Sequence, residues 1–84
     1  MWVTVRLFAR LRDITGASEL MRELPDGSTA RVLWDTLARE FAELDNYRDA
    51  VSTAVNAEHT KMSQVLAEGD EVAFLPPVSG GSTD

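Results

Sequence analysis

The sequence contains no cysteine, and only one of its 84 residues is a histidine. The missing cysteines exclude disulfides, thiol catalysis, iron–sulfur clusters and cysteine-based zinc sites. With only one histidine, His59, the sequence also gives little support for a histidine metal site or a serine–histidine nucleophile pair. We therefore expect a protein that does not enclose a conventional active site of its own.

Basic side chains and long apolar runs are scarce as well. Eight Lys and Arg against 14 Asp and Glu give a net charge of −6, which argues against nucleic-acid binding and suits basic partner surfaces. No apolar run approaches the ~20 residues of a transmembrane helix, and the N-terminus lacks the apolar core of a signal peptide. We expect one soluble domain located in the cytoplasm.

Apolar residues alternate with other residues in four segments, which is the pattern of half-buried strands. These predicted strands are residues 2–8, 18–24, 53–56 and 71–75. Apolar positions spaced by three or four residues predict one main helix from residue 30 to about residue 44, with Ser28 or Thr29 as its N-cap. The other predicted segments are a loop over 9–17, a turn over 56–60 and a helical turn over 63–68.

This order of elements predicts an α+β domain with the ubiquitin-like β-grasp arrangement over residues 1–75. We expect a mixed sheet of four to five strands, with the main helix packed on one face and a flexible C-terminal tail. The apolar stripe of the helix consists of Leu33, Leu37, Phe41 and Leu44. Trp34 lies one position off this stripe and is predicted at the edge of the core, whereas Val65 and Leu66 are predicted to point inward.

Few side chains of this domain are candidates for chemistry. Glu68, Asp70 and Glu71 form an acidic cluster, but their spacing matches no ion-binding loop, so we interpret them as a solvated turn. His59 lies in a predicted polar turn with no partner residue in view. Asn56 lies in the same predicted turn, where we expect its side chain to hydrogen-bond to the turn backbone. We expect no metal site and no bound cofactor.

The residues after the last strand differ from the rest. Pro76 and Pro77 cannot donate to a sheet and favour a stiff, extended exit from the fold. The six residues from 76 to 81 span at most ~20 Å, and the pair Gly80-Gly81 can enter a channel too narrow for a β-carbon. Such a tail could present its C-terminal carbonyl carbon to another protein's active site, although composition alone favours a disordered terminus.

Four segments, covering the chain from residue 1 to residue 81 in order, resemble the small subunits of molybdopterin synthase, the MoaD-type sulfur carriers. The most specific is the run GDEVAFLPPVSGG. The four segments are residues 5–12, 24–29, 54–58 and 69–81. The resemblance implies a β-grasp sulfur carrier that acts in molybdenum cofactor biosynthesis as part of a heterotetramer.

In such a carrier, a ubiquitin-activating-like adenylyltransferase uses ATP to adenylate the carboxylate of the terminal glycine, here Gly81. A sulfur donor system then displaces AMP and leaves a thiocarboxylate. The tail threads into the large synthase subunit, where the sulfur passes to cyclic pyranopterin monophosphate. By this resemblance the tail residues are Pro76, Pro77, Val78, Ser79 and Gly80.

A docking surface follows from the alternation and the resemblance together. Phe8 and Leu75 both fall on the outer sheet face, so they form one apolar patch if the first and last strands are neighbours. This region docks the partners in MoaD-type carriers, and Arg12 lies in one of the matched segments. We therefore predict that Phe8, Leu75 and Arg12 contact partner proteins.

The sequence departs from this family by continuing with Ser82, Thr83 and Asp84 after the second glycine. While they remain, the Gly81 carbonyl is an amide and cannot be adenylated. A protease trims them, or they are an artificial addition, or this copy is not a working carrier; we expect trimming to Gly81. Two other functions remain open, a carrier or modifier for another pathway (thiamine, cysteine or protein conjugation) and a non-covalent interaction module.

Overall fold

The alternating segments assemble into one mixed sheet with strand β1 (Trp2–Leu7) near its middle. The structure is a computed structural model that describes residues 1–77. The sheet order is β2-β1-β5-β3-β4, and β1 lies antiparallel to β2 but parallel to β5. The remaining strands are β2 (Glu19–Glu23), β3 (Ser52–Val55), β4 (Glu58–Thr60) and β5 (Glu71–Leu75).

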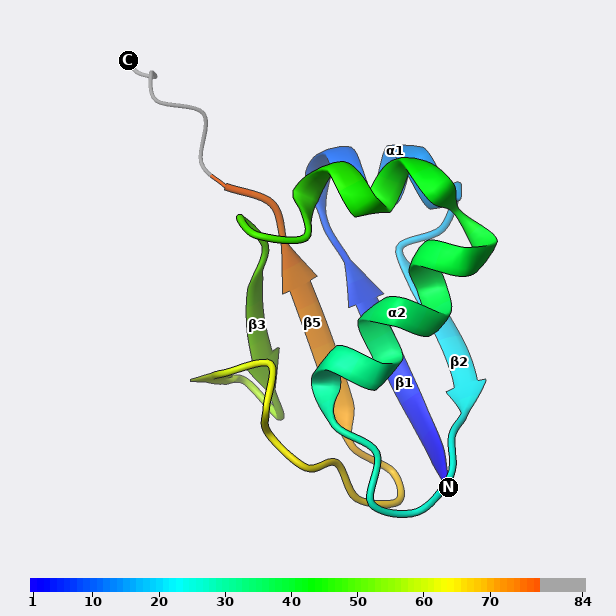
Figure 1. Ribbon diagram of the computed structural model, residues 1–84, viewed down its shortest axis with the longest axis vertical. Coiled ribbons are helices and arrows are strands. Elements are labelled where there is room, and N and C mark those ends of the chain that lie inside the picture. Colours follow the sequence, from blue (N-terminus) through cyan, green and yellow to red (C-terminus); the bar gives the residue numbers. More distant parts are fainter. Residues whose placement is uncertain (78–84) are drawn as a thin grey trace.

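Helix α2 (Ala30–Glu40) crosses one face of this sheet (Figure 1). Thr29 is its N-cap, as the sequence predicts, and the Thr29 hydroxyl oxygen accepts a hydrogen bond of 3.3 Å from the Val32 N–H. Five strands with one main helix on one face confirm the predicted β-grasp arrangement.

The core lies between α2 and the inner face of the sheet. Alternate residues of β1 and β5 point into it, and the ring of Phe74 meets Trp34 edge to face with centroids 5.1 Å apart. Trp34 is fully buried, so its predicted place at the core edge is wrong. The buried cluster consists of Val3, Val5, Leu7, Leu11, Leu24, Ala30, Leu33, Trp34, Leu37, Leu44, Leu66, Val72 and Phe74.

Two predicted boundaries around the helices are also wrong. Residues 9–17 are not a loop, because Ala9–Thr15 form helix α1, which ends at Gly16 in the left-handed conformation (φ +76°). The main helix stops at Glu40 rather than near residue 44. Phe41 leaves the helical conformation with ψ +87°, and Ala42–Tyr47 continue as a separate 3₁₀ helix, η1.

The segment between β3 and β5 differs from the prediction in two ways. The turn contains only Asn56 and Ala57, both with positive φ, and β4 begins at residue 58. Residues 63–68 form no helix. Val65 pairs with Thr29 in an isolated bridge and is 55% exposed, whereas Leu66 is buried as predicted.

Within residues 1–77, no helix is long and apolar enough to cross a membrane.

Candidate functional site

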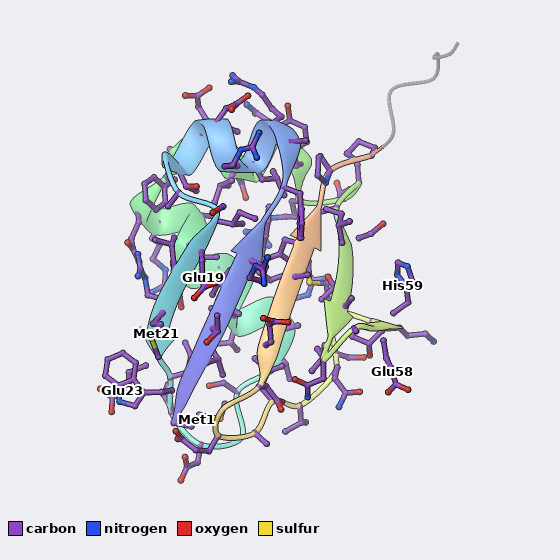
Figure 2. All side chains as sticks on the ribbon, turned by 180° about the vertical axis from the view of Figure 1, so that it is seen from behind. Met1, Glu19, Met21, Glu23, Glu58 and His59 are labelled. Atoms are coloured by element: carbon purple, nitrogen blue, oxygen red, sulfur yellow. The ribbon has the colours of Figure 1, made fainter. Side chains whose placement is uncertain are left out.

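Strands β1 and β5 end side by side, and this brings Phe8 level with Leu75. In their parallel register Arg6 lies opposite Ala73 and Leu7 lies opposite Phe74. The next residues in the same register are Phe8 and Leu75, which alternate outward, away from the core. The first and last strands are thus neighbours, which was the condition for the predicted apolar patch. In residues 1–77 no helix covers this outer face (Figure 2).

The backbone around Phe8 keeps its ring at the edge of this face. Phe8 is extended (φ −123°, ψ +152°) and continues the strand by one residue, while its carbonyl oxygen already accepts a hydrogen bond of 3.0 Å from the Leu11 N–H. Ala9 makes the sharp change of direction with φ +51°, a conformation that costs a non-glycine residue about 1–2 kcal/mol. As a result 39% of Phe8 remains exposed, and Leu75 is half-buried.

Arg6 supports the Phe8 ring from the same face of β1. Its guanidinium carbon lies 6.0 Å from the ring centroid, which is within the range of a cation–π contact. Arg6 Nη1 also lies 3.2 Å from Glu71 Oε2, and Arg6 Nε lies 4.0 Å from Glu19 Oε1. This role of Arg6 was not predicted, although residues 6 and 8 share one face of any strand that contains both.

Helix α1 adds positive charge at this end of the sheet. It contacts β5 and the 3₁₀ helix η1. Arg10 forms an ion pair with Glu43 of η1 at 3.4 Å. Arg12 is exposed, and no carboxylate of residues 1–77 lies within 4.0 Å of its guanidinium. Arg12 can therefore pair with a partner's carboxylate without breaking an ion pair formed within this part of the chain.

The tail leaves the sheet at this same end (Figure 1). Pro76 is half-buried and Pro77 is exposed directly after β5. The predicted tail residues Val78, Ser79, Gly80 and Gly81 lie outside the described residues, as do Ser82, Thr83 and Asp84. The structure thus places the base of the tail beside Phe8 and Leu75.

The acidic cluster of Glu68, Asp70 and Glu71 serves the fold. Glu68 Oε1 accepts a hydrogen bond of 2.9 Å from the Trp2 N–H, and the Asp70 carboxylate accepts one of 2.9 Å from Asn56 Nδ2 and one of 2.8 Å from the Ala67 N–H. Glu71 pairs with Arg6. Within residues 1–77, no three His, Cys, Asp or Glu side chains are placed so that they could hold a metal ion. The acidic cluster closes the turn before β5.

His59 is not in a turn, as the sequence suggested, but in the edge strand β4. It is exposed and pairs in register with Ala54 of β3. Figure 2 shows His59 and Glu58 at this margin of the sheet, away from β2 with its labelled Glu19 and Met21. His59 is therefore separated from β5 by strand β3.

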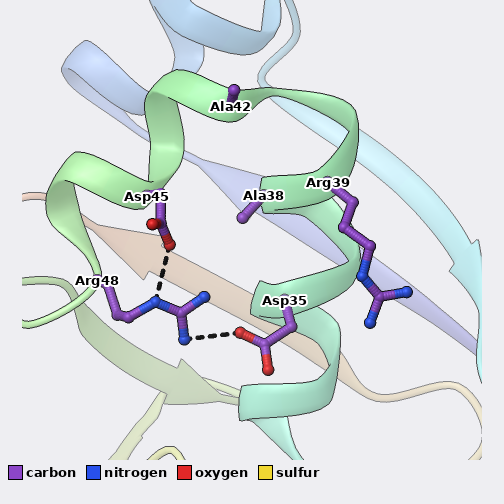
Figure 3. A pocket seen from close by; sticks show the side chains of 6 residues that line it. All are labelled: Asp35, Ala38, Arg39, Ala42, Asp45 and Arg48. Carbon is purple, nitrogen blue, oxygen red and sulfur yellow. Dashed lines mark hydrogen bonds and ion pairs between the residues drawn. The ribbon is translucent and has the colours of Figure 1, made fainter.

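A cavity of about 440 Å³ lies between α2 and η1 (Figure 3). Three of its charged side chains are paired: Arg48 Nε lies 2.8 Å from Asp45 Oδ1, and Arg48 Nη1 lies 2.8 Å from Asp35 Oδ1. The hydrogen bond to Asp45, followed by the smaller effect of the one to Asp35, raises the pKa of Arg48 above its usual value. The arrangement fastens η1 to α2 rather than offering a free acid or base. The lining residues are Asp35, Ala38, Arg39, Ala42, Asp45 and Arg48.

Comparison with known proteins shows which family the chain resembles in sequence. A sequence model of the ThiS family matches residues 5–81. The chain is 40% identical over 79 residues to the molybdopterin synthase sulfur carrier subunit of Arabidopsis thaliana, covering 94% of this chain and 82% of that protein. It is 33% identical to the Homo sapiens protein of the same name, covering 94% of this chain and 93% of that protein.

The fold is shared with a solved protein of similar size. The crystal structure of SAMP1 from Haloferax volcanii superimposes with a TM-score of 0.85 at 27% sequence identity, covering 96% of this chain and all of that one. The likeness therefore extends over the whole β-grasp body.

Proposed function

The chain belongs to the ThiS family, and we propose that it is the sulfur-carrier subunit of a molybdopterin synthase. The observation that carries the proposal is the similarity to molybdopterin synthase sulfur carrier subunits, which reaches 40% identity and covers 94% of the chain. The family match extends to residue 81 and so includes the Gly80-Gly81 pair. We place the protein in the cytoplasm, where its cysteine-free sequence fits a reducing environment.

The chemistry of the carrier takes place at Gly81. Once a protease has removed residues 82–84, a carboxylate oxygen of Gly81 attacks the α-phosphorus of ATP, pyrophosphate leaves, and an acyl adenylate forms. A sulfur nucleophile then attacks the carbonyl carbon, and AMP leaves with the electron pair of the broken carbon–oxygen bond. The resulting thiocarboxylate sulfur is the nucleophile for cyclic pyranopterin monophosphate. The ATP belongs to the activating enzyme, and the carrier itself holds no cofactor.

The partners in this proposal are the large synthase subunit, a ubiquitin-activating-like adenylyltransferase and a sulfur donor system. Phe8 and Leu75 provide an apolar centre and Arg12 a free cation at its side. Partly exposed aromatic and arginine side chains of this kind dominate binding energy when a partner buries them. Because the tail begins next to Leu75, a partner bound here also receives the tail.

A reconstitution tests this function. The chain ending at Gly81 is activated with the adenylyltransferase, ATP and a sulfur donor, and then mixed with the large subunit and cyclic pyranopterin monophosphate. We expect molybdopterin to form in proportion to the carrier added. The matched control is the chain ending at Gly80, whose body is unchanged. Equal product from both chains would contradict the proposal.

A second function, protein modification, is favoured by the similarity to the small archaeal modifier protein 1 of Haloferax volcanii, at 29% identity over 90% of this chain. A modifier forms an amide with target amines, whereas the sulfur carrier transfers sulfur to the pterin precursor. A third possibility is a non-covalent interaction module, for which the chains ending at Gly80 and Gly81 would have the same activity. The reconstitution above separates the sulfur carrier from the other two, and adding target proteins in place of the pterin precursor separates those, because only a modifier would form an amide with them.

A further inference from the structure

Besides Phe8, two large apolar side chains remain exposed on the outer face of the sheet. Trp2 is 47% exposed and Met21 is 55% exposed. In the antiparallel register Trp2 lies opposite Glu23 and Met21 lies opposite Thr4, so Trp2 and Met21 are diagonal neighbours within side-chain reach. We call this pair the Trp2–Met21 patch. It lies about 20 Å from Phe8, because six residue steps of extended chain separate residues 2 and 8.

The backbone presents the Trp2 ring on a fixed support. The Trp2 N–H donates a hydrogen bond of 2.9 Å to Glu68 Oε1, and the Trp2 carbonyl oxygen accepts one of 2.8 Å from the Gly69 N–H. The preceding residue is fixed as well, since the Met1 carbonyl oxygen accepts a hydrogen bond of 2.8 Å from the Leu24 N–H. A partner that covers this ring therefore need not first order the strand that carries it.

Carboxylates without a basic neighbour border the patch. Glu23 and Glu68 are exposed, and no arginine, lysine or histidine nitrogen of residues 1–77 lies within 4.0 Å of either carboxylate. Arg6, the cation on this face of β1, contacts the Phe8 ring and two other carboxylates. Within the same stretch no cation makes such a contact with the Trp2 ring. The Trp2 end of the face is thus apolar and negative, whereas the Phe8 end carries arginines.

The edge of β2 is less suited to a partner than this face. Alternate residues of β2 bond to β1, so the Met21 carbonyl faces the free edge. Arg22 Nη1 donates a hydrogen bond of 2.7 Å to that carbonyl oxygen, and Glu40 holds the same guanidinium. Antiparallel pairing of two β2 strands centred on Met21 would also set Glu19 of each copy against Glu23 of the other, which is unfavourable. These charges select against a second copy as the occupant.

We propose that the Trp2–Met21 patch docks a basic segment of a partner protein. An arginine or lysine of that segment lies over the Trp2 ring and pairs with Glu23, while an apolar side chain beside it packs on Met21. Tryptophan is the best aromatic acceptor for a cation, and methionine adapts its shape to different apolar neighbours. The net charge of −6 steers a basic segment towards the protein.

This site is separate from the surface proposed above for the partners of the tail. Because the two lie about 20 Å apart, one protein can hold the carrier at the Trp2–Met21 patch while another receives the tail at the opposite end of the sheet. The two ends also select opposite charges, an acidic group beside Arg12 and a basic group beside Glu23.

A nuclear magnetic resonance titration of the full chain with the capped peptide acetyl-Arg-Leu-Arg-Leu-Arg-amide tests this site. We expect saturable shifts of the Trp2 indole N–H and Met21 methyl signals, and no such shift of the indole of Trp34, which is fully buried. The peptide acetyl-Gln-Leu-Gln-Leu-Gln-amide should bind about tenfold more weakly, because it lacks cations. Trp2→Thr and Met21→Thr keep a residue that strands accept and should each weaken binding of the basic peptide about tenfold.

Two charge-reversal variants form a matched pair. Glu23→Lys and Glu58→Lys change the net charge equally, but Glu58 lies on β4 at the opposite edge of the sheet (Figure 2). Glu23→Lys should weaken binding of the basic peptide about tenfold, whereas Glu58→Lys should leave its affinity within about twofold, because salt screens the more distant charge. An equal loss from both variants would show attraction by net charge alone and would overturn the site.

Other results would also overturn the inference. These are the absence of any saturable shift, shifts centred on Phe8 and Leu75 instead of Trp2, unchanged affinity in Trp2→Thr, and Trp2 shifts that appear when the protein alone is concentrated. The last result would assign the patch to a second copy. The sulfur-carrier function fails separately: a chain that binds the peptide at Trp2 but gains no sulfur would refute that function and leave the docking site standing.

Discussion

The side chain of Phe8, at the end of β1, remains partly exposed to solvent. The extended backbone at Phe8, the left-handed Ala9 and the guanidinium of Arg6 all hold it there. A core residue at this position would pack inward, as Leu7 does. We propose that this local strain at Ala9 serves a contact that Phe8 makes with another molecule.

The substitution Phe8→Ala should weaken binding to the large synthase subunit at least tenfold, since buried aromatic contacts dominate interfaces. It should lower the free energy of unfolding by only about 1 kcal/mol, because the ring is partly exposed and loses mainly its contact with Arg6. Calorimetric titration and chemical denaturation measure the two effects. The control is Phe74→Ala, which empties a fully buried site and should cost about 3–5 kcal/mol. A similar loss for Phe8→Ala would place Phe8 in the core.

The two-residue turn between β3 and β4 offers a second residue-scale prediction. Asn56 (φ +51°) and Ala57 (φ +71°) both have positive φ, as in the type I′ turn that favours Asn-Gly. Ala57→Gly should therefore raise the free energy of unfolding by about 0.5–1 kcal/mol, even after the greater freedom of glycine in the unfolded chain. Ala57→Val should lower it. A glycine variant less stable than the wild type in chemical denaturation would contradict this turn geometry.

At the scale of the elements, an ion pair links the edge strand β2 to helix α2. Arg22 Nε lies 2.8 Å from Glu40 Oε2 and Arg22 Nη2 lies 2.6 Å from Glu40 Oε1. The hydrogen bonds from Arg22 lower the pKa of the Glu40 carboxyl below its usual value. Because the pair is partly exposed, its net stabilisation is under about 1 kcal/mol.

This pair predicts a pH dependence of stability. A carboxyl whose pKa is lowered by folding stabilises the protein above its unfolded pKa, and the stabilisation is lost as the pH falls through the folded value. Glu40→Gln should therefore be less stable than the wild type at pH 7, and the difference should disappear in acid well below pH ~4.3. Thermal unfolding across this range measures it. Glu23→Gln, at an exposed position of β2, is the control. A difference that persists unchanged in strong acid would contradict the ion-pair explanation.

The elements also show why sequence patterns predicted most of the sheet but not α1. Strand periodicity is strong where one face is buried, as in β1 and β5. Helix α1 has seven residues, one buried side chain (Leu11) and no side-chain cap, so no local signal separates it from a loop. Val65 was predicted inward because a helical turn was assumed; in extended backbone its neighbour Leu66 takes the inner side.

Part of the candidate site could also be predicted from strand periodicity. Alternation alone placed Phe8 and Leu75 on the outer face, and their proximity required only that the strands be neighbours. The burial of Trp34 was not predictable from the helix stripe, because it depends on Phe74 in a distant segment. The contact of Arg6 with Phe8 follows from a shared strand face once the strand is accepted.

At the scale of the whole molecule, the proposed function assigns partner contacts to the body and the chemistry to the tail. Gly81→Val tests this division in the chain ending at residue 81. We expect an unchanged melting temperature, because the change lies beyond the core, and loss of molybdopterin formation, because a β-branched side chain blocks a narrow channel. Ser79→Ala, a small change in the same tail, should keep most activity. Full sulfur transfer by the valine variant would refute the narrow-channel argument.

The absence of cysteine gains a meaning at this scale. A protein without thiols can still carry sulfur if the sulfur is held by its own terminal carboxyl group. The most direct measurement is the intact mass of the chain ending at Gly81 after incubation with the adenylyltransferase, ATP and a sulfur donor. The sulfur-carrier proposal predicts a gain of about 16 Da, as sulfur replaces oxygen, confined to the C-terminal glycine. An unchanged mass, or a gain located elsewhere in the chain, would contradict it.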